Sequence, residues 1–148
     1  HIVQKEIESI SQSVSAHKFI SNLPFKYDQE LKEGGVGISS GQMQLISFAR
    51  ALASNPRILV LDEATSSVDL ETESQIQSGI QELIRERTSI IIAHRISTLM
   101  YADKILVLKH GQIVEFGFRK ELLQQKGIFY KLCQSQLQSQ SLTSDNVE

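Results

Sequence analysis

Residues 58–69 read ILVLDEATSSVD, and this stretch decides the fold class that we expect. Its first four residues, from Ile58 to Leu61, are apolar without alternation, which is typical of a strand buried on both faces in a parallel sheet. Asp62 and Glu63 follow at the carboxyl end of that strand, where open α/β sheets bind their ligands. The stretch therefore predicts a buried strand with an acidic pair at the ligand-binding edge of a parallel sheet.

The segments on either side of this stretch complete a helix–strand–helix–strand pattern. Before it, a helix that opens at Gly41 has one apolar face and ends at Asn55, since the residue before a proline avoids the helical region. After it, residues 70–87 predict a second helix, and residues 90–93 predict a second buried strand that ends at His94. The expected fold class is α/β, with a parallel sheet and flanking helices.

The rest of the chain predicts shorter elements and a polar tail. The tail from Gln134 is rich in Gln and Ser and poor in apolar residues, so we expect it to be disordered. The other expected elements are a helix over residues 3–20, a glycine-rich loop at 33–37, strands at 105–108 and 113–116 joined by a turn at His110–Gly111, and short helices from Lys120 and Ile128.

Composition limits the possible functions. The chain has 148 residues and a formal net charge of -2, so neither nucleic acid nor anionic lipid is attracted by its overall charge. Cys133 is the only cysteine, which excludes an intramolecular disulfide. No apolar run approaches the roughly 20 residues that a transmembrane helix needs. Any membrane role must therefore come through a partner or through polypeptide outside these residues.

The two predicted strand ends carry the side chains best suited to catalysis. Asp62 could hold Mg²⁺ directly or through water, and Glu63 could activate or orient a water molecule. His94 could contact a phosphate. Both strand ends also have a plainer interpretation. Asp62 and Glu63 could form a solvated acidic turn, and His94 could be a half-buried structural histidine. Each sequence pattern alone is short.

Two further segments predict either ligand contacts or helix caps. Residues 38–42, ISSGQ, open the first predicted helix, whose free N–H groups could bind an anion, although Ser39 would equally serve as an ordinary N-cap. Residues 66–69, SSVD, follow the acidic pair, and Asp69 could cap the next helix or belong to a loop that contacts a partner subunit near a nucleotide.

The order of these segments resembles the ATP-binding cassette (ABC) family. Residues 58–69 are similar to its Walker B motif and D-loop, and residues 91–98, IIAHRIST, to its H-loop as written in multidrug, lipid and peptide exporters. Residues 48–52 match the helix after the signature motif, and residues 103–108 and 111–117 match the strands that end the cassette.

The resemblance implies a fold and a division of the chain. The fold would be a P-loop NTPase-like parallel sheet with flanking helices, incomplete here. Residues 1–40 would form part of the helical subdomain, residues 41–133 the C-terminal part of the ATP-binding core, and residues 134–148 a tail.

The resemblance also implies roles for the residues quoted above. The cofactors would be ATP and Mg²⁺, with Asp62 serving the metal, Glu63 the attacking water and His94 the γ-phosphate. Asp69 would couple the two sites of a cassette dimer. The signature residues would contact the γ-phosphate of an ATP held mainly by the opposing cassette; these are Ser39, Ser40, Gly41 and Gln42.

Two departures from the family pattern qualify these roles. The signature is usually Leu-Ser-Gly-Gly-Gln, so Ser40 adds a Cβ where backbone and phosphate meet, and Met43 stands where a basic residue is usual. No G-x-x-x-x-G-K-[ST] loop exists anywhere in the sequence, so there is no nest of N–H groups for the β- and γ-phosphates. We therefore expect either a C-terminal fragment of a longer polypeptide or a gene remnant, and in both cases a chain that is inactive alone.

Three functions are consistent with these observations. The leading one is the ATP-hydrolysing cassette of a membrane exporter, paired with a second cassette and a transmembrane domain on the cytoplasmic face of a plasma or inner membrane, and binding no nucleic acid. The second is a soluble cassette ATPase of DNA repair or chromosome organisation, although no coiled-coil heptads appear. The third is a degenerate partner that completes another chain's site without catalysis.

Overall fold

The computed structural model describes residues 3–31, 37–62, 70–93 and 96–135. The chain divides into two compact units, His1–Ile92 and Ala93–Glu148, and each is described by itself. Both combine helices with a two-stranded sheet, one parallel and one antiparallel. The α/β fold class expected from the sequence is confirmed.

The first unit begins with two short helices where the sequence predicted one over residues 3–20. α1 spans Gln4–Ser13 and α2 spans His17–Ser21, followed by the 3₁₀ turn η1 at Lys26–Asp28. The single-helix prediction is wrong because Ser15 adopts a left-handed conformation with φ 63°. The N–H groups of Ser15 and Ala16 then bond to the carbonyls of Gln12 and Ser11, which is the hydrogen-bond pattern of a Schellman cap.

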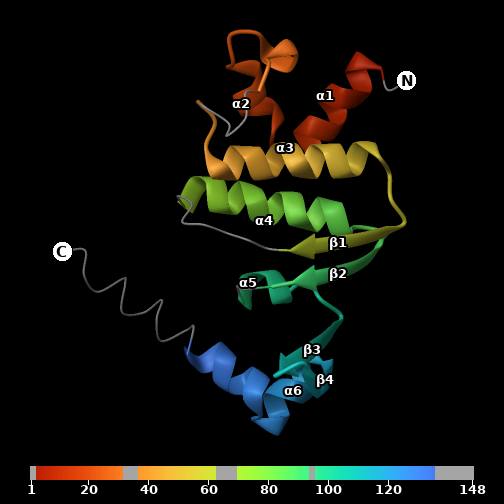
Figure 1. The fold of residues 1–148 in the computed structure, drawn as a ribbon, viewed down its shortest axis with the longest axis vertical. Helices are drawn as coiled ribbons and strands as arrows, with labels where there is room; N and C mark the ends of the chain where they lie inside the picture. The colour runs from red at the N-terminus through yellow and green to blue at the C-terminus, as the bar shows by residue number, and fades with distance from the viewer. Residues whose placement is uncertain (1–2, 32–36, 63–69, 94–95, 136–148) are drawn as a thin grey trace, which may run out of the picture. The chain divides into compact units, whose positions relative to one another are not determined.

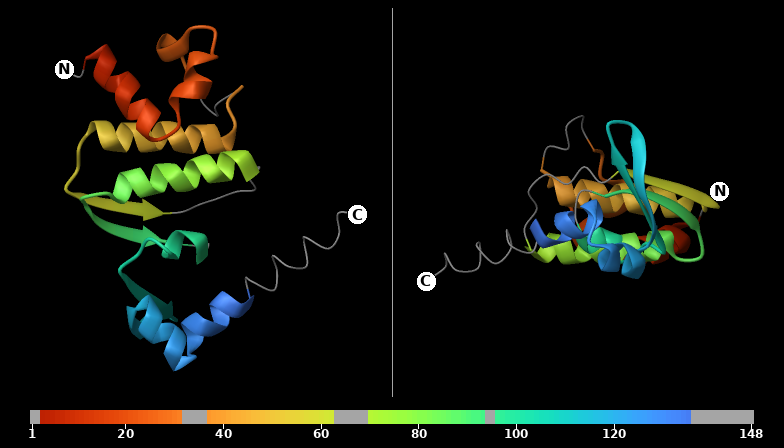
Figure 2. Two further views of the ribbon diagram at one scale, coloured as in Figure 1. Left: turned by 180° about the vertical axis from the view of Figure 1, so that it is seen from behind. Right: turned by 90° about the horizontal axis from the view of Figure 1, so that it is seen from below.

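Two long helices form the centre of the first unit. They lie on one side of its sheet, as Figure 1 and the opposite view on the left of Figure 2 show. α3 spans Ser40–Ala53 and α4 spans Leu70–Ile84. They pack closely because Gly79 on α4 has no Cβ, and one built there would stand 2.9 Å from the Phe48 ring on α3. Their predicted helical character is confirmed, and α3 ends just before Asn55 (φ 44°) and Pro56, as expected.

The predicted parallel strands are confirmed, although their burial differs from the prediction. β1 (Ile58–Asp62) pairs with β2 (Thr88–Ile92), with Asp62 opposite Ile92. Leu59 is buried, whereas Val60 is 61% exposed and Ile90 57% exposed. The expectation of burial on both faces is therefore wrong for the part of the chain that the structure describes, because its helices cover only one face.

The second unit is a hairpin packed against helices. It contains α5 (Ile96–Leu99), β3 (Lys104–Lys109), β4 (Gln112–Phe118), α6 (Arg119–Gln125) and a helix over residues 128–135. His110 and Gly111 both have positive φ, which is the geometry of a two-residue type I′ hairpin turn, and the predicted hairpin is confirmed. Residues 134 and 135 belong to the last helix, so the predicted start of the disordered tail at Gln134 is wrong.

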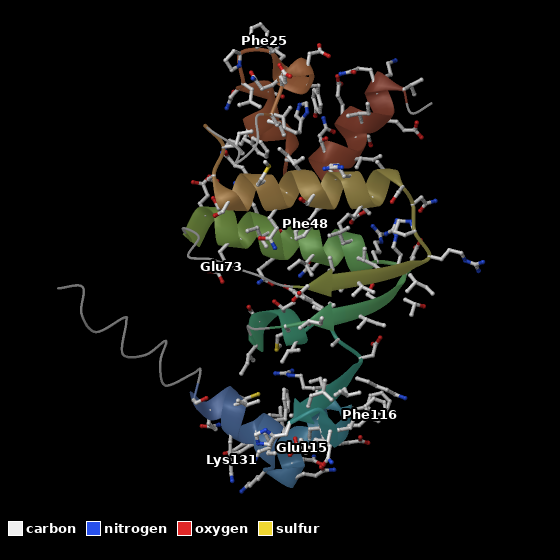
Figure 3. The ribbon with its side chains drawn as sticks, in the orientation of Figure 1. Phe25, Phe48, Glu73, Glu115, Phe116 and Lys131 are labelled. Atoms are coloured by element: carbon white, nitrogen blue, oxygen red, sulfur yellow. The ribbon has the colours of Figure 1, made fainter. Side chains whose placement is uncertain are left out.

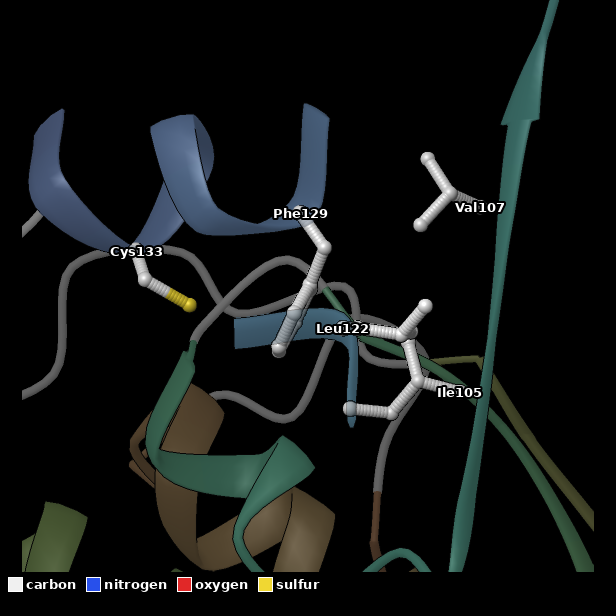
Figure 4. Close-up of a cluster of buried hydrophobic side chains, with 5 residues drawn as sticks. All are labelled: Ile105, Val107, Leu122, Phe129 and Cys133. Atoms are coloured by element: carbon white, nitrogen blue, oxygen red, sulfur yellow. The ribbon is translucent and has the colours of Figure 1, made fainter. Parts of the chain in front are cut away.

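Five buried side chains form the core of the second unit (Figure 4). Burial raises the pKa of the Cys133 thiol, against a smaller opposing effect of Arg119, so the thiol stays protonated at neutral pH and packs as an apolar group. The core residues are Ile105, Val107, Leu122, Phe129 and Cys133.

Within the described ranges, no helix is both long and apolar enough to cross a membrane.

Candidate functional site

The N-terminus of α3 is closed by a reciprocal pair of hydrogen bonds. Ser39 is the N-cap, with an extended backbone, and its Oγ accepts from the Gln42 N–H at 3.2 Å. The Gln42 Oε1 accepts from the Ser39 N–H at 3.1 Å. This arrangement is a capping box, in which two N–H groups that lack helical partners are satisfied by side chains. The N-cap interpretation of Ser39 is therefore correct.

The cap also determines what these side chains can still offer to a ligand. Because Ser39 Oγ and Gln42 Oε1 already accept backbone hydrogens, the hydroxyl proton of Ser39 and the amide protons of Gln42 remain to be donated. Ser39 is exposed, and Gln42 is half-buried. Donors at the positive end of a 14-residue helix suit an anion such as phosphate.

Removing the Ser39 hydroxyl should weaken the helix start. We expect Ser39→Ala to lower the free energy of unfolding by about 1 kcal/mol, the usual value for losing an N-cap. Ser39→Asp should keep most of that free energy, because a carboxylate is an equally good cap, and is the matched control. Urea unfolding of the three proteins tests this, and equal stabilities for wild type and Ser39→Ala would contradict the cap.

Asp62 lies at the exposed carboxyl end of β1, beside the start of α3. α3 and β1 are joined by a short connection that reverses the chain, so Ser40 and Asp62 line the same cavity of about 450 Å³. Ser40 and Asp62 were not expected to lie together, although the short connection between helix and strand could have indicated it. The other lining residues are Met43, Gln44, Ser47, Phe48, Ala51, Leu59, Val60 and Leu61.

Among the described residues, Asp62 is the carboxylate at the end of β1, and a carboxylate is a group that can serve as a ligand of Mg²⁺. Magnesium keeps several waters and takes one or two carboxylates together with substrate phosphates, rather than a cage of protein ligands. The described part of the chain contains no group of three or more His, Cys, Asp or Glu side chains that could form such a cage. A role of Asp62 in binding Mg²⁺ stays a prediction.

The structure brings some of the predicted site residues together and leaves others untested. Ser39, Ser40 and Gln42 share the helix start with Gly41, which is buried there. Glu63, Asp69 and His94 lie outside the described residues, as does most of the glycine-rich loop. β1 and β2 end side by side at Asp62 and Ile92. The roles of Glu63, Asp69 and His94 stay predictions.

Comparison with known proteins points to one family. The family model described as ABC transporter matches residues 2–66. An ABC transporter ATP-binding protein of Bacillus subtilis is 48% identical over 134 residues, which are 90% of this chain and 22% of that protein. A multidrug export ATP-binding/permease protein of Staphylococcus aureus is also 48% identical, over 86% of this chain and 22% of its own length.

A solved structure agrees with these relatives. The structure of a bacterial Atm1-family ABC exporter with ATP bound matches with a TM-score of 0.78 and 37% sequence identity, covering 91% of this chain and 24% of that one. The chain spans about a fifth of the length of the two curated relatives.

Proposed function

We propose, since this chain belongs to the ABC transporter family, that it forms the C-terminal part of an exporter's ATP-binding cassette and helps couple ATP hydrolysis to transport. The observation that carries this proposal is the capped start of α3, where Ser39 still has a hydroxyl proton and Gln42 its amide protons to donate to a ligand. Donors of this kind fit the γ-phosphate of an ATP that an opposing cassette holds.

The proposed roles concern two nucleotides. The start of α3 would serve the ATP that the opposing cassette holds, and the two strand ends would serve the ATP of this chain's own cassette. Asp62 would hold Mg²⁺, which neutralises charge on the phosphates when it is bound. Glu63 would take a proton from the attacking water or orient it, and His94 would contact the γ-phosphate. Asp69 would couple the two sites of the dimer. Ser40 and Gly41 complete the signature loop.

The location and partners follow from this proposal. The chain would work at the cytoplasmic face of a plasma or inner membrane, beside a second cassette and attached to a transmembrane domain. Residues 1–40 would belong to the helical subdomain and residues 41–133 to the ATP-binding core.

The 148-residue chain alone should bind ATP weakly. It lacks a G-x-x-x-x-G-K-[ST] loop, and backbone N–H groups and the lysine of such a loop normally supply much of the contact to the β- and γ-phosphates. We expect calorimetry to give a dissociation constant well above the micromolar range and turnover to be negligible. Micromolar affinity for ATP would contradict the proposal that ATP binding depends on a phosphate-binding loop that these 148 residues lack.

Pairing with an intact cassette tests the proposal directly. Size-exclusion chromatography should show ATP-dependent association of this chain with a cassette that carries a complete phosphate-binding loop, and none with ADP, which lacks the γ-phosphate. Ser39→Asp should abolish the pairing, because it keeps the helix cap but puts a carboxylate against the phosphate. Association that is independent of nucleotide, or unaffected by Ser39→Asp, would contradict a role of the α3 start in binding ATP.

A further inference from the structure

Glu115 on β4 caps a helix that begins more than ten residues later. Its Oε1 accepts from the Ile128 N–H at 2.5 Å, and its Oε2 accepts from the Phe129 N–H at 2.9 Å. Ile128 and Phe129 are the first two residues of the helix over residues 128–135. Their N–H groups have no partner within that helix, so the carboxylate of Glu115 supplies both.

Gly127 leaves the space that this carboxylate occupies. A Cβ built at Gly127 would collide with Glu115 Oε1, and it would also stand 2.9 Å from Glu115 Cδ. Gly127 does not have the positive φ that often explains a glycine. Its small size is therefore required by Glu115, and the two residues form one unit, here called the Glu115 cap (Figure 3 labels Glu115).

The Glu115 cap is connected to the core and, through it, to α5. Phe129, whose N–H the carboxylate holds, is 2% exposed and belongs to the buried cluster of the second unit (Figure 4). Ile96 and Leu99 of α5 and Ile128 pack against that cluster. In the sequence, α5 starts shortly after His94. A shift of Phe129 would therefore reach the helix that follows the proposed γ-phosphate contact.

We propose that Glu115 is a positioning residue of the ATPase. By holding the start of the last helix, it fixes the core against which α5 packs, and in the sequence α5 begins two residues after His94. This inference rests on the proposed function only for its catalytic consequence, because the cap itself is a property of the fold.

The test compares two glutamates of the second unit in the assembled transporter. Glu121 on α6 accepts a single hydrogen bond, from the Phe118 N–H at 3.2 Å. Glu115→Gln and Glu121→Gln each remove one negative charge and keep one carbonyl oxygen. Glutamine can therefore replace the one bond of Glu121, whereas it can replace only one of the two bonds of Glu115.

Two readouts separate the cap from its effect on catalysis. We expect Glu115→Gln to speed amide hydrogen exchange in residues 128–135 and 96–99 by about tenfold, the effect of losing one charge-assisted hydrogen bond. The kcat for ATP should fall by about tenfold, with KM little changed, because most of the ATP contact would lie elsewhere. Gly127→Ala should reproduce both effects, and Glu121→Gln neither.

Each unexpected result has a distinct meaning. Unchanged exchange in both Glu115→Gln and Gly127→Ala would overturn the cap. Faster exchange with unchanged kcat would overturn the positioning role. A wild-type transporter without ATPase activity would instead overturn the proposed function. The hydrogen-exchange data would still test the Glu115 cap in that case.

Discussion

Glu63→Gln is expected to reduce ATP turnover by about 10²- to 10⁴-fold in the assembled transporter, the usual contribution of a general base. Glutamine has nearly the shape of glutamate but cannot take a proton from the attacking water. ATP binding should remain, because the proposed metal and γ-phosphate contacts of that nucleotide come from Asp62, His94 and polypeptide outside this chain rather than from Glu63. The measurement is steady-state ATPase activity together with ATP-dependent pairing on size exclusion.

The matched control for this variant is Glu71→Gln, on the first turn of α4. Glu71 lies 3.9 Å from Lys18 in an ion pair whose side chains are both largely exposed, and such pairs contribute little to stability. Glu71→Gln should leave turnover and pairing within error of wild type. If Glu63→Gln retained more than about a tenth of the activity, or lost pairing as well as turnover, Glu63 would not be the base.

The central elements could be predicted from the sequence because their signals are local and strong. The apolar runs at residues 58–61 and 90–92 indicate strands because both are short and contain β-branched residues. Asn55–Pro56 fixes the end of α3 by backbone sterics, and His110–Gly111 fixes the hairpin by its turn chemistry. These parts of the fold follow from neighbouring residues.

Other parts depend on contacts between residues distant in sequence. Residues 3–20 keep helical spacing throughout, yet the helix is interrupted at Ser15. Val14 and Ala16, on either side of Ser15, are fully buried. Burial of these two side chains outweighs the strain of a left-handed serine. The Glu115 cap is similar, since nothing near Glu115 in the sequence indicates a bond to residues 128 and 129.

The positions of three candidate site residues in the fold could be predicted from the sequence, whereas their roles stay predictions. The order of motifs indicated Ser39, Gln42 and Asp62 correctly as neighbours of a helix start and a strand end. The sequence left open whether Ser39 caps the helix or meets a ligand. The reciprocal bonds with Gln42 show that capping uses only its acceptor capacity, so the two roles are compatible.

Phe48→Ala should cause the largest loss of stability in the first unit. Phe48 is 6% exposed and lies between α3 and α4, against Gly79 (Figure 3). Truncating a buried phenylalanine costs about 3–5 kcal/mol, a large part of the roughly 5–15 kcal/mol that holds a typical domain together. Urea unfolding should show this loss, and pairing should weaken with it, because α3 carries the signature residues.

The contact between Phe48 and Gly79 can be isolated with a double-mutant cycle. In wild type, Gly79→Ala puts a Cβ 2.9 Å from the ring, so strain should cancel the gain of about 1 kcal/mol that alanine brings to a helix interior. In Phe48→Ala the strain is gone, and Gly79→Ala should stabilise. Phe25→Ala, at a 68% exposed phenylalanine, should change stability by less than about 0.5 kcal/mol. Equal effects of Gly79→Ala in both backgrounds would mean that the α3–α4 contact is not held by this pair.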